Sequence, residues 1–149
     1  MSALELRRID NTELGEAREL VRVIEAYYPD RAWPLSVEQI QQSKVFYYRA
    51  LREGEVIGIC GIDQKTPTLA ETVKTVVFHP FRGQGLGAML SQRVEDECRS
   101  LGITKVMSTI YSFNHPMLLI KLKQGYRIEG YHPDHERPGF HEYSLGKIL

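Results

Sequence analysis

A glycine-rich turn has the residue types and the spacing that bind an anion. It reads Arg82-Gly83-Gln84-Gly85-Leu86-Gly87 and lies between a strand-like segment and an amphipathic helix pattern. Backbone N–H groups at the start of a helix lack partners, and glycines let an anion approach them closely. Packing alone would explain one or two glycines, but not three at alternate positions beside an arginine that can add a charge-assisted contact. A pyrophosphate group is the expected ligand.

Two familiar phosphate loops are excluded by the spacing of these glycines. A Walker loop ends in Gly-Lys-Ser or Gly-Lys-Thr, and the dinucleotide fingerprint is G-x-G-x-x-G. Gly83, Gly85 and Gly87 alternate and match neither pattern. The turn therefore indicates a different class of anion site.

A mixed arrangement of strands and helices must position this turn. After it, apolar residues recur at helical spacing to Leu101, and Gly102 stands where a helix commonly ends. Ser36 and Gln39 resemble a capping box, and the polar cluster at 10–12 offers oxygens that can cap a first helix. We expect helices over 14–28, 36–43, 86–101 and 116–124, and strands over 4–9, 46–51, 56–62, 72–78, 105–111, 126–131 and 140–145.

Composition limits the class of protein. A chain of 149 residues fits one domain, residues 1–149. Its 19 Lys and Arg balance 19 Asp and Glu, which argues against a nucleic-acid partner or an anionic membrane surface. The N-terminal segment carries Glu5, Arg7 and Arg8 where a signal peptide is apolar, so we expect a cytoplasmic protein. Cys60 and Cys98 lie in apolar patterns without metal-type spacing, which favours two reduced core thiols over a disulfide.

Two motifs together resemble those of the GNAT superfamily of acyl-CoA dependent N-acyltransferases. The first is Arg-x-x-Gly-x-Gly at Arg82, Gly85 and Gly87. The second runs from Asn114 to Gly125 and its following aromatic residue, Tyr126. The resemblance implies an α/β fold with a mixed, mostly antiparallel sheet of about seven strands and about four helices. In that fold the sheet is splayed between strands 4 and 5.

The resemblance also implies a co-substrate and a reaction. Acetyl-CoA would bind with its pantetheine arm along the exposed edge of the fourth strand and its pyrophosphate on the glycine-rich turn. An amine would attack the thioester directly, which makes the chain an N-acetyltransferase acting on a primary amine of a small molecule or peptide. The cofactor-binding residues implied are Thr75, Val76, Val77, Phe78, Arg82, Gly83, Gln84, Gly85, Leu86, Gly87, Ala88 and Asn114.

Glu71 is the candidate general base, because it matches an acidic residue that several family members use near the start of the fourth strand. The four residues from Glu71 to Thr75 span roughly 13 Å of extended chain, so Glu71 would act through water or where a bulge shortens the path. An exposed carboxylate at a strand start is the alternative. His79 stands where the family usually has a proline, which favours a role in the turn over catalysis.

Lys121 occupies the position of the family tyrosine that commonly protonates the CoA sulfur. A lysine there either donates a proton, contacts CoA phosphates, or lies solvated on the helix face. Tyr111 and Tyr126 are possible substitutes, each with a packing role as the alternative, and water can also protonate a thiolate. The absent tyrosine leaves a second function open, a non-catalytic acetyl-CoA binding or sensing module.

The acceptor site is expected between two loops. Tyr27, Tyr28 and Trp33 can form one wall, with core packing as the alternative for the tyrosines, and His135 lies in the loop that the family places opposite. That loop has metal-capable side chains, but Pro138 and Gly139 do not suggest the fixed geometry of a zinc site, so no metal is expected. The acidic residues near the expected mouth suit a cationic amine and are Asp30, Asp134 and Glu136. The oligomeric state stays open, with a homodimer possible.

Overall fold

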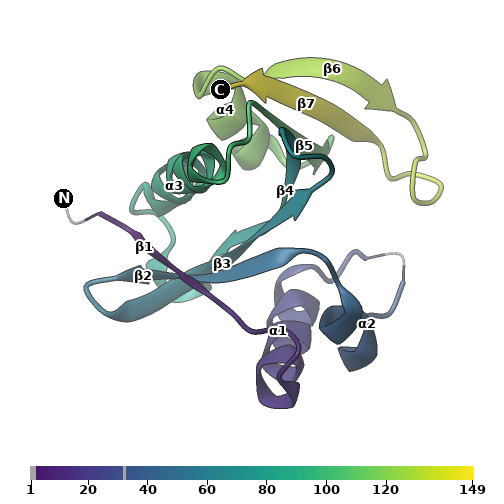
Figure 1. Cartoon of the computed structure of the whole chain (residues 1–149). Coiled ribbons are helices and arrows are strands. Elements are labelled where there is room, and N and C mark those ends of the chain that lie inside the picture. The colour runs from purple at the N-terminus through teal and green to yellow at the C-terminus, as the bar shows by residue number, and fades with distance from the viewer. Residues whose placement is uncertain (1–2, 32) are drawn as a thin grey trace.

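A seven-stranded mixed sheet with helices on both faces forms the centre of the part of the chain that the structure describes (Figure 1). This computed structural model describes residues 3–31 and 33–149. The strand order is β1-β2-β3-β4-β5-β7-β6. The strands are β1 (Glu5–Arg8), β2 (Phe46–Arg52), β3 (Glu55–Gln64), β4 (Leu69–Val77), β5 (Lys105–Tyr111), β6 (Arg127–His132) and β7 (Glu142–Ile148). The helices are α1 (Leu14–Tyr27), α2 (Val37–Gln42), α3 (Leu86–Ser100) and α4 (His115–Lys123), with a 3₁₀ turn, η1, at His79–Phe81.

The strands β4 and β5 separate soon after they meet. They pair in parallel only from Leu69 to Glu71, whereas β5 pairs with β7 along its whole length. Beyond Glu71, no described strand pairs with the edge of β4 that faces β5. All other neighbouring strands are antiparallel, so the predicted fold class, including the splay between strands 4 and 5, is confirmed.

β4 also carries a bulge on its other edge. Its register with β3 shifts between Ile59 and Gly61. As a result, two residues of β4, Lys74 and Thr75, lie opposite one residue of β3, Cys60. Lys74 has a left-handed backbone, with φ of 52°. The bulge turns the second half of β4 relative to the first half, just beyond the point where β5 departs.

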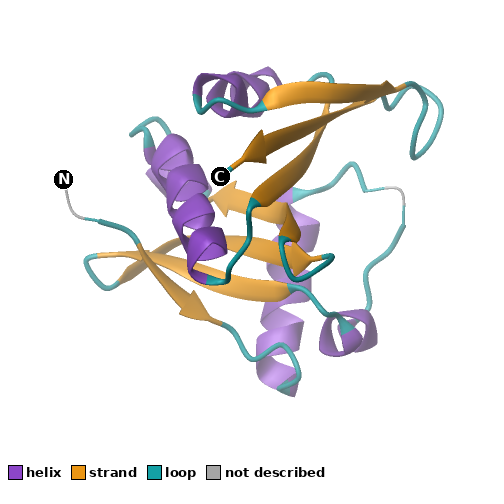
Figure 2. Cartoon of the chain, turned by 45° about the horizontal axis from the view of Figure 1, so that its top comes forward, coloured by secondary structure: helices purple, strands orange, loops and turns teal. Residues whose placement is uncertain are grey.

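Two apolar cores hold the helices against the sheet. On one face α3 buries Leu90, Val94 and Cys98. On the opposite face α1 buries Leu20 and Ile24. Figure 2 shows α1 and α3 on opposite sides of the strands. The glycine-rich turn is therefore anchored at both ends, because β4 before it lies within the sheet and α3 after it packs on the first core.

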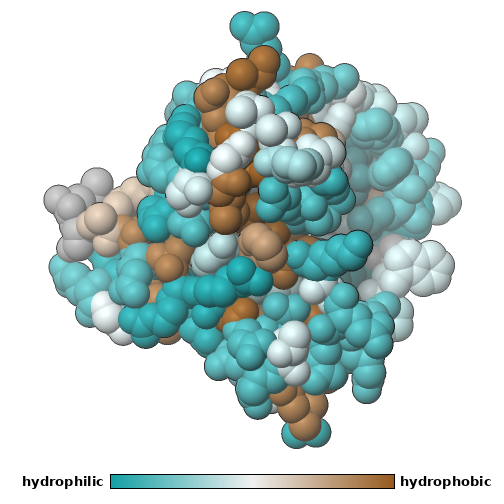
Figure 3. All heavy atoms as spheres, in the orientation of Figure 1, coloured by the Kyte–Doolittle hydropathy of each residue, from teal (hydrophilic) through white to brown (hydrophobic). Residues whose placement is uncertain are grey.

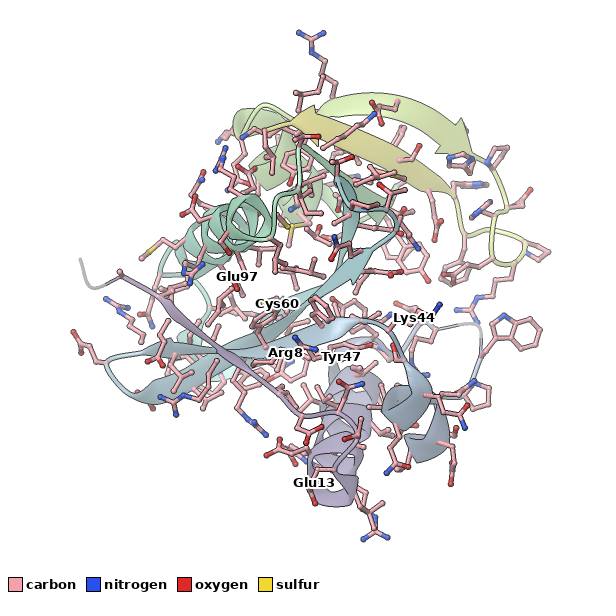
Figure 4. All side chains as sticks on the ribbon, viewed as in Figure 1. Arg8, Glu13, Lys44, Tyr47, Cys60 and Glu97 are labelled. Carbon is pink, nitrogen blue, oxygen red and sulfur yellow. The ribbon has the colours of Figure 1, made fainter. Side chains whose placement is uncertain are left out.

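Both cysteines are buried free thiols, as predicted. Cys60 lies on β3 beneath α3 (Figure 4). Burial raises the pKa of the Cys60 thiol and raises that of Cys98 to about 11. Both thiols are therefore protonated at neutral pH and behave as apolar core groups.

Element ends differ from the sequence-based expectation in specific places. The side chain of Glu13 caps α1 by accepting from Gly15 N and Glu16 N, so the prediction that the cluster at 10–12 provides this cap is wrong (Figure 4). Asp10 instead accepts from Thr12 and stabilises the turn before the helix. The predicted capping box of Ser36 is confirmed. β4 begins three residues before the predicted start because residues 69–71 pair with β5.

Hydrophilic side chains cover most of the face seen in Figure 3. Within residues 3–31 and 33–149, no helix is both long and apolar enough to cross a bilayer.

Candidate functional site

The glycine-rich turn places an uncapped helix start next to the end of β4. Gly83 and Gly85 have φ of 80° and 74°, a left-handed conformation that glycine adopts without steric cost. Gly85 is the N-cap of α3, and no side chain of the described residues caps this helix. The first N–H groups of α3 therefore have no intrahelical partner and are available to an anion.

Gly87 lies in the first turn of α3, where packing does not require a glycine. A Cβ added at this position would meet only Ile120 Cδ1 among the described atoms, at 3.4 Å. This is close to an ordinary van der Waals contact. The absence of a side chain at Gly87 is thus better explained by access to the helix start than by the fold.

Arg82 holds the turn against the strand. Its Nε donates to Val77 O at 3.1 Å, and its guanidinium lies 5.6 Å from the centre of the Tyr27 ring. In this arrangement the arginine stabilises the bend between β4 and α3. Its contact with a phosphate stays a prediction.

The second half of β4 presents alternate backbone groups to the open edge. Phe78 N donates to Ile57 O on β3 at 2.9 Å, so this amide is not free. Because successive amides of a strand point to opposite edges, the N–H and C=O of Val77 face the side from which β5 has departed, where the C=O already accepts from Arg82 Nε. The N–H of Val77 is therefore the predicted strand group best placed to donate to an amide-bearing arm.

A cavity of ≈ 940 Å³ opens beside the splay. Its lining comes from the segment between α1 and α2, from β4 and β5, from α4 and from the loop between β6 and β7. The structure thus brings together parts of the chain that are far apart in sequence. The predicted site residues among the lining are Tyr27, Tyr28, Trp33, Glu71, Thr75, Asn114, Lys121 and His135.

Glu71 stands where β4 and β5 separate, at the edge of this cavity. Its Oε1 accepts from Thr109 Oγ1 at 3.0 Å, and its Oε2 lies 3.6 Å from Lys65 Nζ. The carboxylate is thus held in one orientation and is not a freely solvated strand-end group. Its role as a base stays a prediction.

Lys121 is buried, so the alternative of a solvated lysine on the helix face is wrong. Its Nζ donates to Ser91 Oγ on α3 at 2.7 Å and lies 4.6 Å from the centre of the Tyr126 ring. Burial lowers the pKa of Lys121 to about 8, against the opposing attraction of Glu95. The ammonium is engaged between α3 and α4, while the residue also lines the cavity.

Both tyrosines considered as substitutes have a pKa above the usual value for tyrosine, so each is a weaker acid than a solvated phenol. Tyr111 donates from Oη to Glu136 Oε2 at 2.5 Å, and burial raises its pKa. Tyr126 is buried, its pKa is raised by burial, and its Oη has no hydrogen-bond partner in the described part of the chain. Both side chains also pack within the fold.

Acidic side chains reach the cavity from three directions. Asp30 and Glu136 line it, as predicted for the mouth, and Glu142 adds a carboxylate whose pKa is raised by burial. Asp134 does not line it. Its Oδ1 accepts from Gly139 N at 2.7 Å, so it stabilises its own loop instead.

His79 belongs to the turn after β4. It lies in η1, its N–H donates to Tyr27 Oη at 3.1 Å, and its ring stacks on that of Tyr27. These contacts agree with the turn role that the sequence favours. Within residues 3–31 and 33–149, no group of three or more His, Cys, Asp or Glu side chains is arranged to hold a metal ion.

Two cationic residues of the lining have no signal in the sequence. Lys74 reaches the cavity from the β4 bulge, and Arg31 reaches it from the segment after α1. A bulge interrupts strand alternation without a distinctive residue pattern, which is why the position of Lys74 was not predicted. Arg31 lies in an irregular loop, where periodicity gives no facing direction.

Comparisons with known proteins agree on one family. Residues 5–126 match the family model described as acetyltransferase (GNAT) family. An uncharacterised N-acetyltransferase of Chlorobaculum tepidum is 30% identical over 99 residues, which is 66% of this chain and 64% of that protein. This chain therefore matches less than two thirds of that relative.

Solved structures share the fold at low sequence identity. A provisionally named phosphinothricin N-acetyltransferase has a TM-score of 0.80 and 22% identity, covering 99% of both chains. An aminoglycoside 6′-N-acetyltransferase solved with coenzyme A has a TM-score of 0.73 and 17% identity, covering 97% of this chain and 96% of that one. At such identities the likeness concerns the arrangement of the backbone.

Proposed function

The chain belongs to the GNAT acetyltransferase family, and we propose that it transfers an acetyl group from acetyl-CoA to a primary amine of a small molecule or peptide. The carrying observation is that residues 72–75 of β4, beyond the point where β5 departs, line one cavity, and that an uncapped, glycine-lined helix start follows the same strand in the chain. The aminoglycoside enzyme of the same fold was solved with coenzyme A, which supports the choice of co-substrate.

The residues proposed to hold acetyl-CoA form two groups. The N–H groups of 83–88 would bind the pyrophosphate, helped by the positive end of the α3 dipole. The open edge at Thr75–Val77 would pair with the amides of the pantetheine arm as an added strand would. Asn114 caps α4, because its Oδ1 accepts from Met117 N at 3.4 Å, and it faces the cavity near this edge.

Two groups of the chain are proposed to assist the attack of the amine. A backbone N–H on the open edge of β4, that of Val77 for example, would stabilise the oxyanion formed at the thioester carbonyl. Glu71 would accept the proton of the amine through a water molecule, since it lies four residues before Thr75 along β4. Its bonds to Thr109 and Lys65 would keep the carboxylate in place.

The proton for the departing CoA sulfur has two possible sources. Lys121 takes the position of the family tyrosine, but its ammonium is held by Ser91 on α3. Solvent in the cavity is the other source, and the two differ in pH dependence. If Lys121 supplies the proton, turnover falls as pH rises past about 8, where this group loses its charge.

Acetyl-CoA turnover is the test of this function. Release of CoA should be followed with polyamines, amino acids and peptide N-termini, and only an enzyme produces amine-dependent release. A non-catalytic acetyl-CoA module, which the engaged Lys121 makes the second candidate, predicts a thermal shift that grows with acetyl-CoA but no turnover. If the domain does not bind CoA, acetyl-CoA should produce no thermal shift.

The expected compartment is the cytoplasm. The two buried free thiols support it, because reduced cysteines are the rule where glutathione and thioredoxin operate. Fractionation of the expressing cell tests this placement.

A further inference from the structure

Lys74 places a cation in the wall of the cavity without an anionic partner. Lys74 lies in the bulge of β4 and lines the cavity, and its Nζ is 4.7 Å from the centre of the Tyr28 ring. The ammonium forms no hydrogen bond or ion pair with any residue that the structure describes. A lysine ammonium has three donors, so a half-buried one can accept a further ligand.

Arg31 adds a second cation to the same cavity. Its guanidinium donates from Nη1 to Trp33 O at 2.8 Å, and its Nη2 lies 3.7 Å from Glu25 Oε1. Its Nε is buried and has no partner among the described residues. The arginine is thus fixed at one end and keeps one buried donor unused.

The two cations repel each other. Burial lowers the pKa of Lys74, and the charge of Arg31 lowers it further. An anion bound beside them would remove this repulsion and would satisfy the free donors with charge-assisted hydrogen bonds. A cation entering this part of the cavity would meet repulsion instead.

The cavity also has carboxylates, at Asp30, Glu71, Glu136 and Glu142. Glu136 and Glu71 attract the Lys74 ammonium, but neither forms an ion pair with it within 4.0 Å. The lining therefore carries charges of both signs, and the ammonium of Lys74 is not held by a close carboxylate. A molecule with both charges complements this lining better than a polyamine does.

We propose that the acceptor carries an anionic group close to its amine, as an α-amino acid does, and that Lys74 and Arg31 bind this group while the amine faces the carboxylates. The inference rests on the proposed acetyl transfer and names its substrate class. A carboxylate oxygen can accept from the unpaired ammonium of Lys74, while the charge of Arg31 adds attraction for the anion.

Matched acceptors test the proposal. Each of a panel of free amino acids is compared with its amide, which keeps the amine and removes the negative charge. For the wild-type protein we expect kcat/KM to be about tenfold or more higher for the acids, the size expected for a lost charge-assisted hydrogen bond. Lys74→Met should lower kcat/KM for the acids by about tenfold to a hundredfold and change it for the amides by less than about threefold. Lys74→Arg should keep most of the preference.

Controls separate this effect from damage to the fold or to the co-substrate site. Lys123→Met removes an exposed cation outside the cavity and should leave both acceptor classes unchanged. Acetyl-CoA affinity of Lys74→Met, measured by calorimetry, should equal that of the wild type. Equal kcat/KM for acids and amides in the wild type, or an equal loss for both in Lys74→Met, overturns the proposal.

Failure of the proposed acetyl transfer would look different. In that case no amine gives CoA release, and the anion site is tested by calorimetry with N-acetyl amino acids and their amides. Tighter binding of the acids, lost in Lys74→Met, supports the site without catalysis. Absence of this difference overturns it.

Discussion

Replacing Lys121 by methionine removes a buried ammonium between α3 and α4, and the effect on stability should depend on pH. In the folded chain the pKa of Lys121 lies at about 8 instead of the usual 10.5, mainly because of burial. At about 1.4 kcal/mol for each pKa unit, the charged form is disfavoured by about 3 kcal/mol on folding. Methionine fills a similar volume and has no charge to desolvate.

The sign follows from proton binding. Because the folded pKa is the lower one, the unfolded chain binds more protons between pH 8 and 10.5. The stability that Lys121 contributes therefore rises with pH through this window, whereas the methionine variant has no such gain. At pH 7 we expect Lys121→Met to be more stable than the wild type by up to about 3 kcal/mol, less the lost bond to Ser91. This advantage should shrink as pH approaches 10.5.

Urea unfolding of both proteins at pH 7, 8, 9 and 10 measures the difference. Tyr126, Cys60 and Cys98 also titrate differently in the folded chain, but they are present in both proteins and largely cancel. Removing the cation raises the Cys98 pKa further, which lowers the stability of the variant at high pH and acts in the same direction. Lys123→Met on the exposed side of α4 is the control and should show no such pH dependence. A difference that stays constant from pH 7 to pH 10 would refute the reasoning.

Three further substitutions test other parts of the molecule. Gly87→Ala should keep or slightly raise the melting temperature, because the added Cβ meets only Ile120 Cδ1 at 3.4 Å. Calorimetry should nevertheless show a marked loss of acetyl-CoA affinity. Normal affinity would contradict the proposed pyrophosphate site. Gly58→Ala should destabilise the fold by about 3 kcal/mol or more in urea unfolding, because its Cβ would lie 2.1 Å from Val76 O, and a loss below about 1 kcal/mol would contradict this. Glu71→Gln should lower kcat by about a hundredfold with acetyl-CoA affinity unchanged, the size expected for loss of a general base, and an unchanged kcat would remove Glu71 from that role.

Local patterns predicted most of the fold. The helical spacing from Leu86 and the glycine at 102 predicted α3 to within one residue of its end. The Ser36 capping box and the range of β5 are also as predicted. These features depend on contacts between near neighbours in the chain. The start of β4 and the cap of α1 were missed because each depends on a particular partner, β5 for the first strand residues and the reach of Glu13 for the cap.

The site was predictable only where a motif encodes backbone geometry. The glycine-rich turn has such a motif, because positive φ at Gly83 and Gly85 and an uncapped helix start require these residues. Burial of Lys121 could not be predicted, since it requires Ser91 on α3 to lie within hydrogen-bond distance of a lysine on α4. The presence of Lys74 and Arg31 in one cavity likewise could not be predicted, because it depends on a bulge and an irregular loop.

One structural feature links the proposed co-substrate and acceptor sites. β5 leaves β4 at Glu71, and the bulge at Lys74 follows within three residues. The departure exposes the edge proposed to bind the pantetheine arm, and the bulge turns Lys74 toward the cavity proposed to bind the acceptor. The thioester carbonyl would then lie next to the acceptor amine because both ligands are placed by the same short stretch of one strand. A substitution that displaces this stretch, as Gly58→Ala should by pressing on Val76 O, is therefore expected to weaken the binding of acetyl-CoA and acceptor together.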